Sequence, residues 1–298
     1  MGARIRIIVD STADLPPALL ERWDIVVLPI YLLLEGRSYR DDAALDRARF
    51  YEQLAQHRLK TAAPPPHEFL AAYEALVAAG AEEIIGLFIS ASLSSIYGNA
   101  QLAAQQLEGA RVHIVDTGQI SMGIGWLAIA AAQAAAEGAT ASEIVALLEE
   151  LRQRVLVVGV LESITHLHRS GRVNWATAWV GEILQIKPLI YFYTGEAGLI
   201  GKVRTHRRAV QALADWIVAL GPLEQVAFLH SHTNPRVSAR FQAELTPVLP
   251  ELTLQPIEVS PVLGVHIGPG GLGVALVQAS NGGPLPNMIN HFDRESSC

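Results

Sequence analysis

The sequence contains a single cysteine, Cys298, among its 298 residues. One cysteine cannot form an internal disulfide, so a disulfide-stapled fold is excluded and a reducing compartment is favoured. Aromatic residues are also scarce, at 6%, although 50% of the residues are hydrophobic. The interior must therefore consist mainly of Ala, Val, Leu and Ile side chains. This composition suits core packing and also the wall of a pocket for an aliphatic ligand.

Positive charge is in short supply. The 22 Lys and Arg residues are outnumbered by 29 Asp and Glu residues, which gives a formal net charge of −7. A protein that binds nucleic acid needs concentrated Lys and Arg to neutralise phosphates, and the only basic run lies at 202–208. We therefore expect no nucleic-acid partner.

Long hydrophobic runs are lacking too. The longest weakly polar stretch, 123–136, is rich in alanine, contains Gln133 and falls short of the roughly 18 apolar residues that a membrane span requires. The residues before Asp14 carry charges around a short apolar strand and lack the apolar region of a secretory signal. We expect a cytoplasmic protein without a membrane span.

The chain length favours two domains, for which we predict the bounds 1–154 and 155–298. In the first half, short apolar runs alternate with longer helical stretches. The runs lie at 5–9, 25–34, 84–89 and 112–115, and the predicted helices lie near 46–57, 66–80 and 95–107. Apolar runs without polar alternation are typical of parallel strands covered by helices on both faces. The N-terminal domain is therefore predicted to be α/β, with a mostly parallel sheet flanked by helices.

The second half shows a different pattern. Predicted strands at 189–193 and 199–203 are joined by a Gly-containing turn, which indicates a hairpin. Further strands are expected at 155–161, 226–230, 253–259 and 273–279, and helices near 163–169, 175–184, 205–220 and 235–246. We predict a second, α+β domain with antiparallel strands, followed by an irregular tail from Ser280.

Three familiar chemical motifs are missing or incomplete. Residues 268–273 satisfy the pattern G-x-G-x-x-G, but a strand rather than a helix is expected to follow, which disfavours dinucleotide binding. No phosphate-binding G-x-x-x-x-G-K-[ST] loop and no G-x-S-x-G nucleophile elbow occur. The histidine pairs at 230/232 and 166/168 lack further ligands at recognisable spacing, so we predict no metal site.

Hydroxyl side chains follow several of the predicted parallel strands. Ser94 and Ser95 lie where the run 84–89 gives way to a helix, whose free amides and dipole would favour a carboxylate. Ser94 could equally be no more than the helix N-cap. Asp10 and Asp14 could form a carboxylate site, but we favour a capped helix start in which Asp14 accepts from free amides.

Two further side chains are held by stiff surroundings. Thr61 precedes the extended segment 62–66, which contains three prolines. His266 lies among glycines and prolines at 260–273, which predicts a polar site on a stiff bend between apolar runs. The simpler interpretation of this bend is a turn between strands that carries an incidental histidine.

Taken together, these residues and several ordered motifs resemble the DegV family, the bacterial fatty-acid-binding proteins that include the FakB subunits of fatty acid kinase. The motifs that carry the resemblance are 9–15 (VDSTADL), 115–117 (VDT), 121–125 (SMGIG), 170–173 (SGRV), 186–189 (IKPL), 201–205 (GKVRT) and 260–270 (SPVLGVHIGPG). The last of these is the most specific.

The resemblance implies a non-catalytic carrier that buries one long-chain fatty acid in an apolar tunnel between its domains. A separate ATP-dependent kinase subunit would phosphorylate the acid to an acyl phosphate, and no other cofactor is expected. By the same resemblance, the ligand-binding residues are Thr61, Ser94, Ser95, Arg172, Gly264 and His266. Arg204 would contact the partner kinase. The sequence departs from the residues common in the family at Ala62, Ala63, Ser95 and Ile96.

An alternative from another class is an α/β enzyme. In that interpretation, Ser94 and His266 would act together on a small acyl or phosphoryl substrate.

Overall fold

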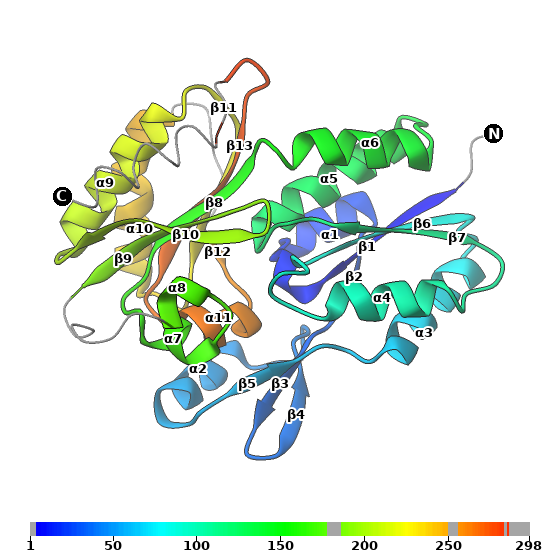
Figure 1. Cartoon of the computed structure of the whole chain (residues 1–298), viewed down its shortest axis with the longest axis horizontal. Helices are drawn as coiled ribbons and strands as arrows, with labels where there is room; N and C mark the ends of the chain where they lie inside the picture. The colour runs from blue at the N-terminus through cyan, green and yellow to red at the C-terminus, as the bar shows by residue number, and fades with distance from the viewer. Residues whose placement is uncertain (1–3, 178–185, 250–255, 283–284, 286–298) are drawn as a thin grey trace.

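The computed structural model describes residues 4–177, 186–249, 256–282 and 285. Two large sheets lie side by side, and a small third sheet projects below the junction between them in Figure 1. The α/β architecture predicted from the sequence is confirmed. Among the described residues, no helix has both the length and the apolarity that crossing a membrane would require.

The first sheet has four parallel strands in the order β2-β1-β6-β7. Its strands are β1 (Ile5–Asp10), β2 (Val26–Leu28), β6 (Glu83–Phe88) and β7 (Arg111–Asp116). The central strands β1 and β6 are buried over most of their length, as expected when helices cover both faces. In Figure 1, α3 (Pro66–Ala78) and α4 (Ile96–Ala104) lie on one side of this sheet, and α5 (Met122–Ala136) and α6 (Ala141–Leu151) lie on the other. Helix α1 (Pro17–Trp23) contacts α5.

Helix α5 is buried on nearly every side of its first three turns, because it contacts both large sheets. The indole N–H of Trp126 on this helix donates to the carbonyl of Ala275 in the second sheet, at 3.1 Å. A helix that is apolar all round belongs in a protein core. The alanine-rich stretch 123–136 is therefore the helix on which the two sheets pack.

The third sheet was not expected, because the run 25–34 was predicted to be one strand. Pro29 lies in the middle of this run and has no N–H to donate to a neighbouring strand, so the run divides. The first part is β2, and the second part is β3 (Tyr31–Leu34), which pairs with β4 (Arg37–Arg40) and β5 (Lys60–Ala62) in antiparallel fashion. Helix α2 (Arg47–Gln56) connects β4 to β5.

The second large sheet has the order β10-β9-β8-β13-β11-β12 and is antiparallel except for the pair β11 and β12. Its strands are β8 (Val155–Val160), β9 (Lys187–Tyr193), β10 (Glu196–Val203), β11 (Leu223–His230), β12 (Ile257–Glu258) and β13 (Leu272–Gln278). The predicted hairpin is confirmed as β9 and β10. Its turn residues Thr194 and Gly195 both have positive φ, at 43° and 88°, as a two-residue hairpin turn requires.

Two helices, α9 (His206–Ala219) and α10 (Pro235–Leu245), cover the outer face of the second sheet and build a core with it. The remaining helices, α7 (Thr165–Ser170), α8 (Asn174–Thr177) and α11 (Pro261–Ile267), lie near the junction of the sheets. The short 3-10 turns are η1 (Ser11–Ala13) and η2 (Thr246–Val248).

Parts of three predicted segments fall outside the described residues. The helix predicted at 175–184 is described only through Thr177 and the strand at 253–259 only from residue 256, while most of the tail and Cys298 are not described. The domain boundary at residue 154 stays a prediction. One hydrophobic core contains residues on both sides of this position, including Leu151, Val155 and Ala275.

Candidate functional site

A cavity of about 280 Å³ lies between the carboxyl ends of the first sheet and the inner face of the second sheet. Most of the side chains that line it are aliphatic or aromatic. They include Ile30, Ile89, Leu93 and Ile120 from the first sheet's side, and Val157, Ile190, Phe192 and Leu229 from the second sheet. In an open α/β sheet, ligands bind beyond the carboxyl ends of the strands, and this cavity has that position.

Polar side chains also line this cavity. Thr61, Ser94, Ser95, Arg172 and His266 all line the cavity, although they come from four separate segments of the chain. The structure therefore brings together most of the residues predicted to bind a ligand. Gly264 and Arg204 do not line the cavity. Arg204 is exposed between β10 and α9, and its predicted role and that of Gly264 stay predictions.

His266 lies in the last turn of α11, so the predicted bend is in fact a short helix. The helix forms because Ser260 caps it, with its hydroxyl oxygen accepting from the Leu263 N–H at 3.3 Å, and because Pro261 occupies the first helical position. The helix ends at Gly268, whose φ of 79° disfavours any other residue. The glycines and prolines of this motif thus start and stop a helix.

Thr61 and His266 are joined across the site, with 3.0 Å between Thr61 Oγ1 and His266 Nε2. Burial, together with the nearby Arg172 guanidinium, lowers the pKa of His266 to about 4. The imidazole is therefore neutral at physiological pH and carries one N–H. Within the described part of the chain, His266 Nδ1 is buried without a hydrogen-bond partner.

Ser94 and Ser95 lie in the turn that leads from β6 into α4. Ser95 is the N-cap residue of α4, but its side chain caps no amide. The Ser94 hydroxyl accepts from the Ile96 N–H at 3.3 Å, which leaves its own proton free to be donated. The two interpretations of Ser94 are thus compatible, because it contacts the helix start and also lines the cavity.

Asp14 does not cap α1, contrary to the prediction. The residue before α1 is Pro16, and the Asp14 carboxylate points instead toward α11 and the α5 start. It accepts from the Ser260 N–H at 2.7 Å and from the Ser121 hydroxyl at 2.5 Å. Burial raises the pKa of Asp14 to about 8 in spite of these two donors. Asp14 thereby fixes the first residue of the helix that carries His266.

Asp10 has a purely local role. Its carboxylate accepts from the Thr12 hydroxyl and N–H, which caps η1, and from the Ile89 N–H at 2.7 Å. Burial raises the pKa of Asp10. These contacts hold together the ends of β1 and β6. Asp10 is the residue that caps a helix here, namely η1, whereas Asp14 was the predicted cap.

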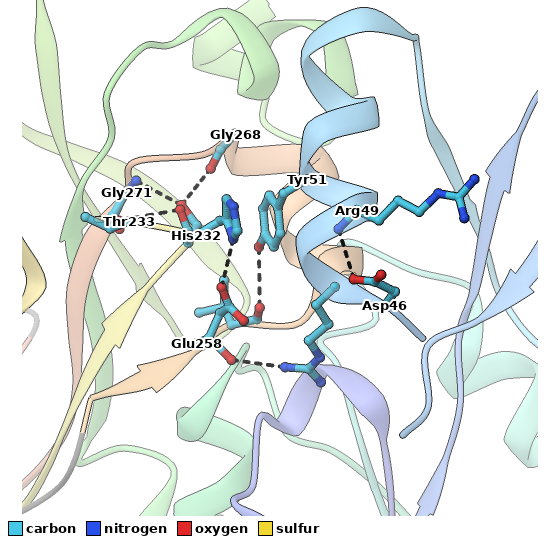
Figure 2. Close-up of polar contacts among 11 residues, drawn as sticks. Asp46, Arg49, Tyr51, His232, Thr233, Glu258, Gly268 and Gly271 are labelled. Carbon is cyan, nitrogen blue, oxygen red and sulfur yellow. Dashed lines mark hydrogen bonds and ion pairs between the residues drawn. The ribbon is translucent and has the colours of Figure 1, made fainter. Parts of the chain in front are cut away.

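A second contact fixes the third sheet, and with it Thr61, against the second sheet. Figure 2 shows Tyr51 of α2 face to face with His232, with ring centroids 4.7 Å apart and an interplanar angle of 7°. His232 Nδ1 lies 3.2 Å from Glu258 Oε1, and the Tyr51 hydroxyl donates to the Val259 carbonyl at 3.4 Å. Gly264 also packs here, because a Cβ at this position would lie 2.4 Å from the Tyr51 hydroxyl oxygen.

The His230 and His232 pair does not share one face of a strand. β11 ends at His230, and His232 lies in the following loop with a φ of 44°. In the part of the chain that the structure describes, no group of three His, Cys, Asp or Glu side chains is arranged to hold a metal ion.

The enzyme interpretation requires a serine, a base and a group that orients the base. His266 Nε2 faces Thr61 rather than Ser94, and among the described residues its Nδ1 has no orienting partner. This arrangement suits the binding of a head group better than activation of a nucleophile.

A profile of the family described as "Uncharacterised protein, DegV family" matches residues 4–279. The chain belongs to the DegV family. A DegV domain-containing protein from Deinococcus radiodurans is 33% identical to it over 280 residues, which cover 91% of this chain and 98% of that protein.

Solved DegV structures share the fold over nearly the whole chain. A DegV family protein from Thermus thermophilus, whose structure was described for fatty acid binding, is 30% identical to this chain and has a TM-score of 0.85. The match covers 93% of this chain and 100% of the Thermus thermophilus chain. DegV from Bacillus subtilis, described as a fatty acid binding protein, is 25% identical, with a TM-score of 0.84 over the same shares.

Sequence reasoning missed the supports of this DegV site. The contacts of Asp14 with Ser260 and of Tyr51 with His232 join positions far apart in the chain, and nothing in their local sequence indicates the pairing. The apolar wall was expected only in general terms. The non-alternating run Val155–Val160 was a usable signal, because it supplies Val157 and Gly159 to the cavity.

Proposed function

We propose that this DegV protein is a carrier that binds one long-chain fatty acid in the cavity between its sheets and presents the carboxylate to an ATP-dependent fatty acid kinase. The observation that carries the proposal is the composition of one cavity. Its wall is mainly apolar, and its polar residues include Thr61, Ser94, Arg172 and His266, of which Thr61 and His266 are in direct contact.

The apolar wall supplies the affinity in this proposal. Burying one methylene group contributes roughly 0.8 kcal/mol, so about 14 methylenes contribute on the order of 11 kcal/mol before the costs of ordering the chain. The aliphatic lining residues cannot replace the hydrogen bonds that a polar substrate makes with water. They therefore favour the binding of an acyl chain over that of a polar substrate. An acid of roughly 14 to 18 carbons is the expected ligand.

The polar side chains of the cavity orient the ligand in this proposal. A carboxylate cannot be buried without donors, and the site offers the hydroxyls of Thr61 and Ser94 together with the Arg172 guanidinium. Because His266 is neutral, its Nε2–H can donate to the Thr61 oxygen and thereby aim the Thr61 proton at the carboxylate. Ser95 and Gly264 complete the proposed site, Gly264 by packing α11 against Tyr51.

The kinase belongs to the proposal because the chain offers no phosphate-binding loop of its own. A carboxylate oxygen would attack the terminal phosphorus of ATP held by the partner, and the bond from that phosphorus to the bridging oxygen would break, releasing ADP. No proton has to move, since the nucleophile is already ionised. We place the pair in the cytoplasm, where ATP is supplied, and assign exposed Arg204 to the partner surface.

The fatty acid binding described for the Thermus thermophilus and Bacillus subtilis proteins supports the carrier proposal. The decisive test is extraction of the purified protein with organic solvent, followed by mass spectrometry. We expect a fatty acid in the extract, and after delipidation we expect uptake of hexadecanoic acid but much weaker uptake of its methyl ester. A lipid-free extract, together with no uptake of added acids of 14 to 18 carbons, would overturn the proposal.

A further inference from the structure

A second cavity of about 260 Å³ adjoins the first and shares Thr61, Arg172 and His266 with it. The other lining residues come from two segments. The segment between α2 and β5 supplies His57, Arg58, Leu59 and Lys60, and the end of α7 supplies His166, Arg169 and Ser170; Leu54 and Val265 complete the wall. Three of the proposed head-group residues therefore line both an apolar cavity and a polar one, whereas Ser94 and Ser95 line only the apolar cavity.

The charged residues that line this second cavity are all positive. Four cations line it, namely Arg58, Lys60, Arg169 and Arg172, and no carboxylate lines it. Among the described residues, none of these four side chains has a carboxylate oxygen within 4.0 Å. Of the lining histidines, His266 is neutral, and burial and Arg169 lower the pKa of His166, so the positive charge of the cavity comes from the four cations. Such a concentration is unexpected in a chain with a net charge of −7.

Helix capping explains only part of this pattern. A cation near a helix C-terminus gains about 0.3–1 kcal/mol from the helix dipole, and Arg169 lies in the last turn of α7. Arg58 and Lys60 lie beyond the end of α2, and Arg172 follows the capping Gly171. Capping also gives no reason for these four side chains to line the same cavity.

We propose that the second cavity is an anion subsite that binds the phosphoryl group of an acyl phosphate, or a free phosphate dianion, next to the proposed carboxylate position. Guanidinium groups bind phosphate oxygens through paired N–H donors, and Arg58, Arg169 and Arg172 provide such groups around a volume that can hold one phosphate. The proposal that the cavity binds phosphate depends only on the residues that line it. The proposal that the cavity retains an acyl phosphate rests on the proposed function.

The position of the subsite matches the chemistry of the proposed product. When a carboxylate oxygen held at Thr61 and His266 becomes bonded to phosphorus, the new phosphoryl group must lie beyond these residues, away from the acyl chain. The second cavity is the space on that side. The four cations would offset the two negative charges of the phosphoryl group and so retain the product in the carrier.

The test uses delipidated protein and inorganic phosphate, measured by calorimetry at low ionic strength. The triple variant Arg58→Gln, Lys60→Gln, Arg169→Gln leaves the proposed head-group residues intact. We expect it to raise the phosphate dissociation constant by about 10-fold or more, because each lost charge-assisted contact contributes roughly a factor of ten. The charge-matched control is Arg207→Gln, Arg208→Gln, Arg236→Gln, whose exposed side chains do not line the cavity, and this control should retain the wild-type value.

A second arm separates the two sources of the anion. Hexadecyl phosphate, a stable mimic of an acyl phosphate, should bind wild-type protein more tightly than hexadecanoic acid does, and the triple variant should lose this preference while it still binds the acid. The imidazole of His166, whose pKa is lowered by burial and by Arg169, should titrate at higher pH when phosphate is bound, as followed by NMR.

Phosphate affinity that is equal in the triple variant and the control would overturn the subsite. Failure of the proposed function gives a different result. If the protein binds no fatty acid but still binds phosphate, and the triple variant weakens that phosphate binding, the anion subsite is supported although the carrier proposal is wrong. If the triple variant does not fold, as judged by its circular dichroism and thermal unfolding, the single change Arg169→Gln replaces it, with Arg236→Gln as control. A phosphate affinity of Arg169→Gln equal to that of its control would likewise overturn the subsite.

Discussion

Replacement of Thr61 by valine removes the hydroxyl at the centre of the proposed head-group site without changing the shape of the side chain. Thr61 lies in β5, where a β-branched residue is well tolerated, so the strand should persist. The change deletes the 3.0 Å contact with His266 Nε2 and the donor that we assign to the carboxylate. Apolar contacts with the acyl chain are left unchanged.

The expected loss follows from the charge of the group that accepts the hydrogen bond. A hydrogen bond to a charged group contributes about 1.5–3 kcal/mol, which corresponds to roughly a 10- to 100-fold rise in the dissociation constant for the fatty acid. The effect on an uncharged ligand is smaller, because a neutral hydrogen bond contributes only about 0.5–1.5 kcal/mol. Folding stability should fall by only about 1 kcal/mol, since Thr61 is half-buried and loses one internal hydrogen bond.

The assay compares hexadecanoic acid with its methyl ester on delipidated wild-type and Thr61→Val protein by calorimetry or by displacement of a fluorescent fatty acid. Thr140→Val serves as a stability control. Thr140 caps α6 through the Glu143 N–H, so its loss costs about 1 kcal/mol of folding stability, yet it does not line the cavity. This control should bind both ligands with wild-type affinity.

Weaker binding of the acid and of the ester by the same factor in Thr61→Val would contradict the role assigned to the Thr61 hydroxyl. Equal factors would mean that the hydroxyl affects the general shape of the cavity rather than the carboxylate. An affinity for the acid that is unchanged would also remove Thr61 from the proposed site.

Three further predictions concern the supports of the site. The pKa of the His266 imidazole should be near 4 in delipidated protein rather than near the ordinary histidine value of 6.5, and Arg172→Gln should raise this pKa; an NMR titration midpoint near 6.5 in the wild type would show that burial does not lower the pKa. The pKa of Asp14 is about 8 in the folded state and near the ordinary aspartate value of 3.8 in the unfolded chain, so rising pH between these values should destabilise the wild type by roughly 1 kcal/mol per pH unit relative to Asp14→Asn. Urea unfolding of both proteins at pH 5 and pH 7.5 measures this difference, and a difference that does not change with pH would exclude a raised pKa. Gly264→Ala should lower stability by about 1–3 kcal/mol because its Cβ would meet the Tyr51 ring, whereas Gly201→Ala, which has nothing within 4 Å, provides the control in thermal unfolding. Equal melting temperatures of the two alanine variants would show that α2 and α11 are not tightly packed.

Local patterns predicted the secondary structure well where burial was uniform. The central strands β1 and β6 of the first sheet are buried over most of their length, so their apolar runs stand out without any knowledge of their neighbours. The prediction of one strand at 25–34 is wrong, because Pro29 ends the parallel strand β2 and the chain continues into β3 of another sheet. The third sheet was missed for this reason.

The motif around His266 shows a different limitation. Ser260, Pro261 and Gly268 are the N-cap, first residue and C-cap of a helix, and all three signals were present in the sequence. They were interpreted as a bend because glycine and proline are typical of turns, and because α11, at seven residues, is too short to show a clear helical period. A short capped helix and a turn differ in where the side chain of His266 points, but not in composition.

The candidate site could be found from the sequence only through the family resemblance, since Thr61, Ser94, Arg172 and His266 lie in four separate segments. Their meeting depends on tertiary contacts that have no local signal. Asp14 is an example, because its carboxylate pairs with an amide 246 positions away. The resemblance located the residues, whereas only the structure explains what holds them.

The division of the site among several segments has a physical consequence for a carrier. Thr61 is fixed through the third sheet and α2, and His266 through α11 and Asp14, so neither half alone offers a carboxylate a complete set of donors. The contact between Thr61 and His266 joins the two halves of the site directly. A preassembled site loses less entropy when it binds, and the acyl chain can then supply most of the affinity. Tyr51 also joins the halves, because its ring lies face to face with His232, its hydroxyl donates to the Val259 carbonyl and Gly264 packs against it, so an opening between the halves would break several contacts at Tyr51.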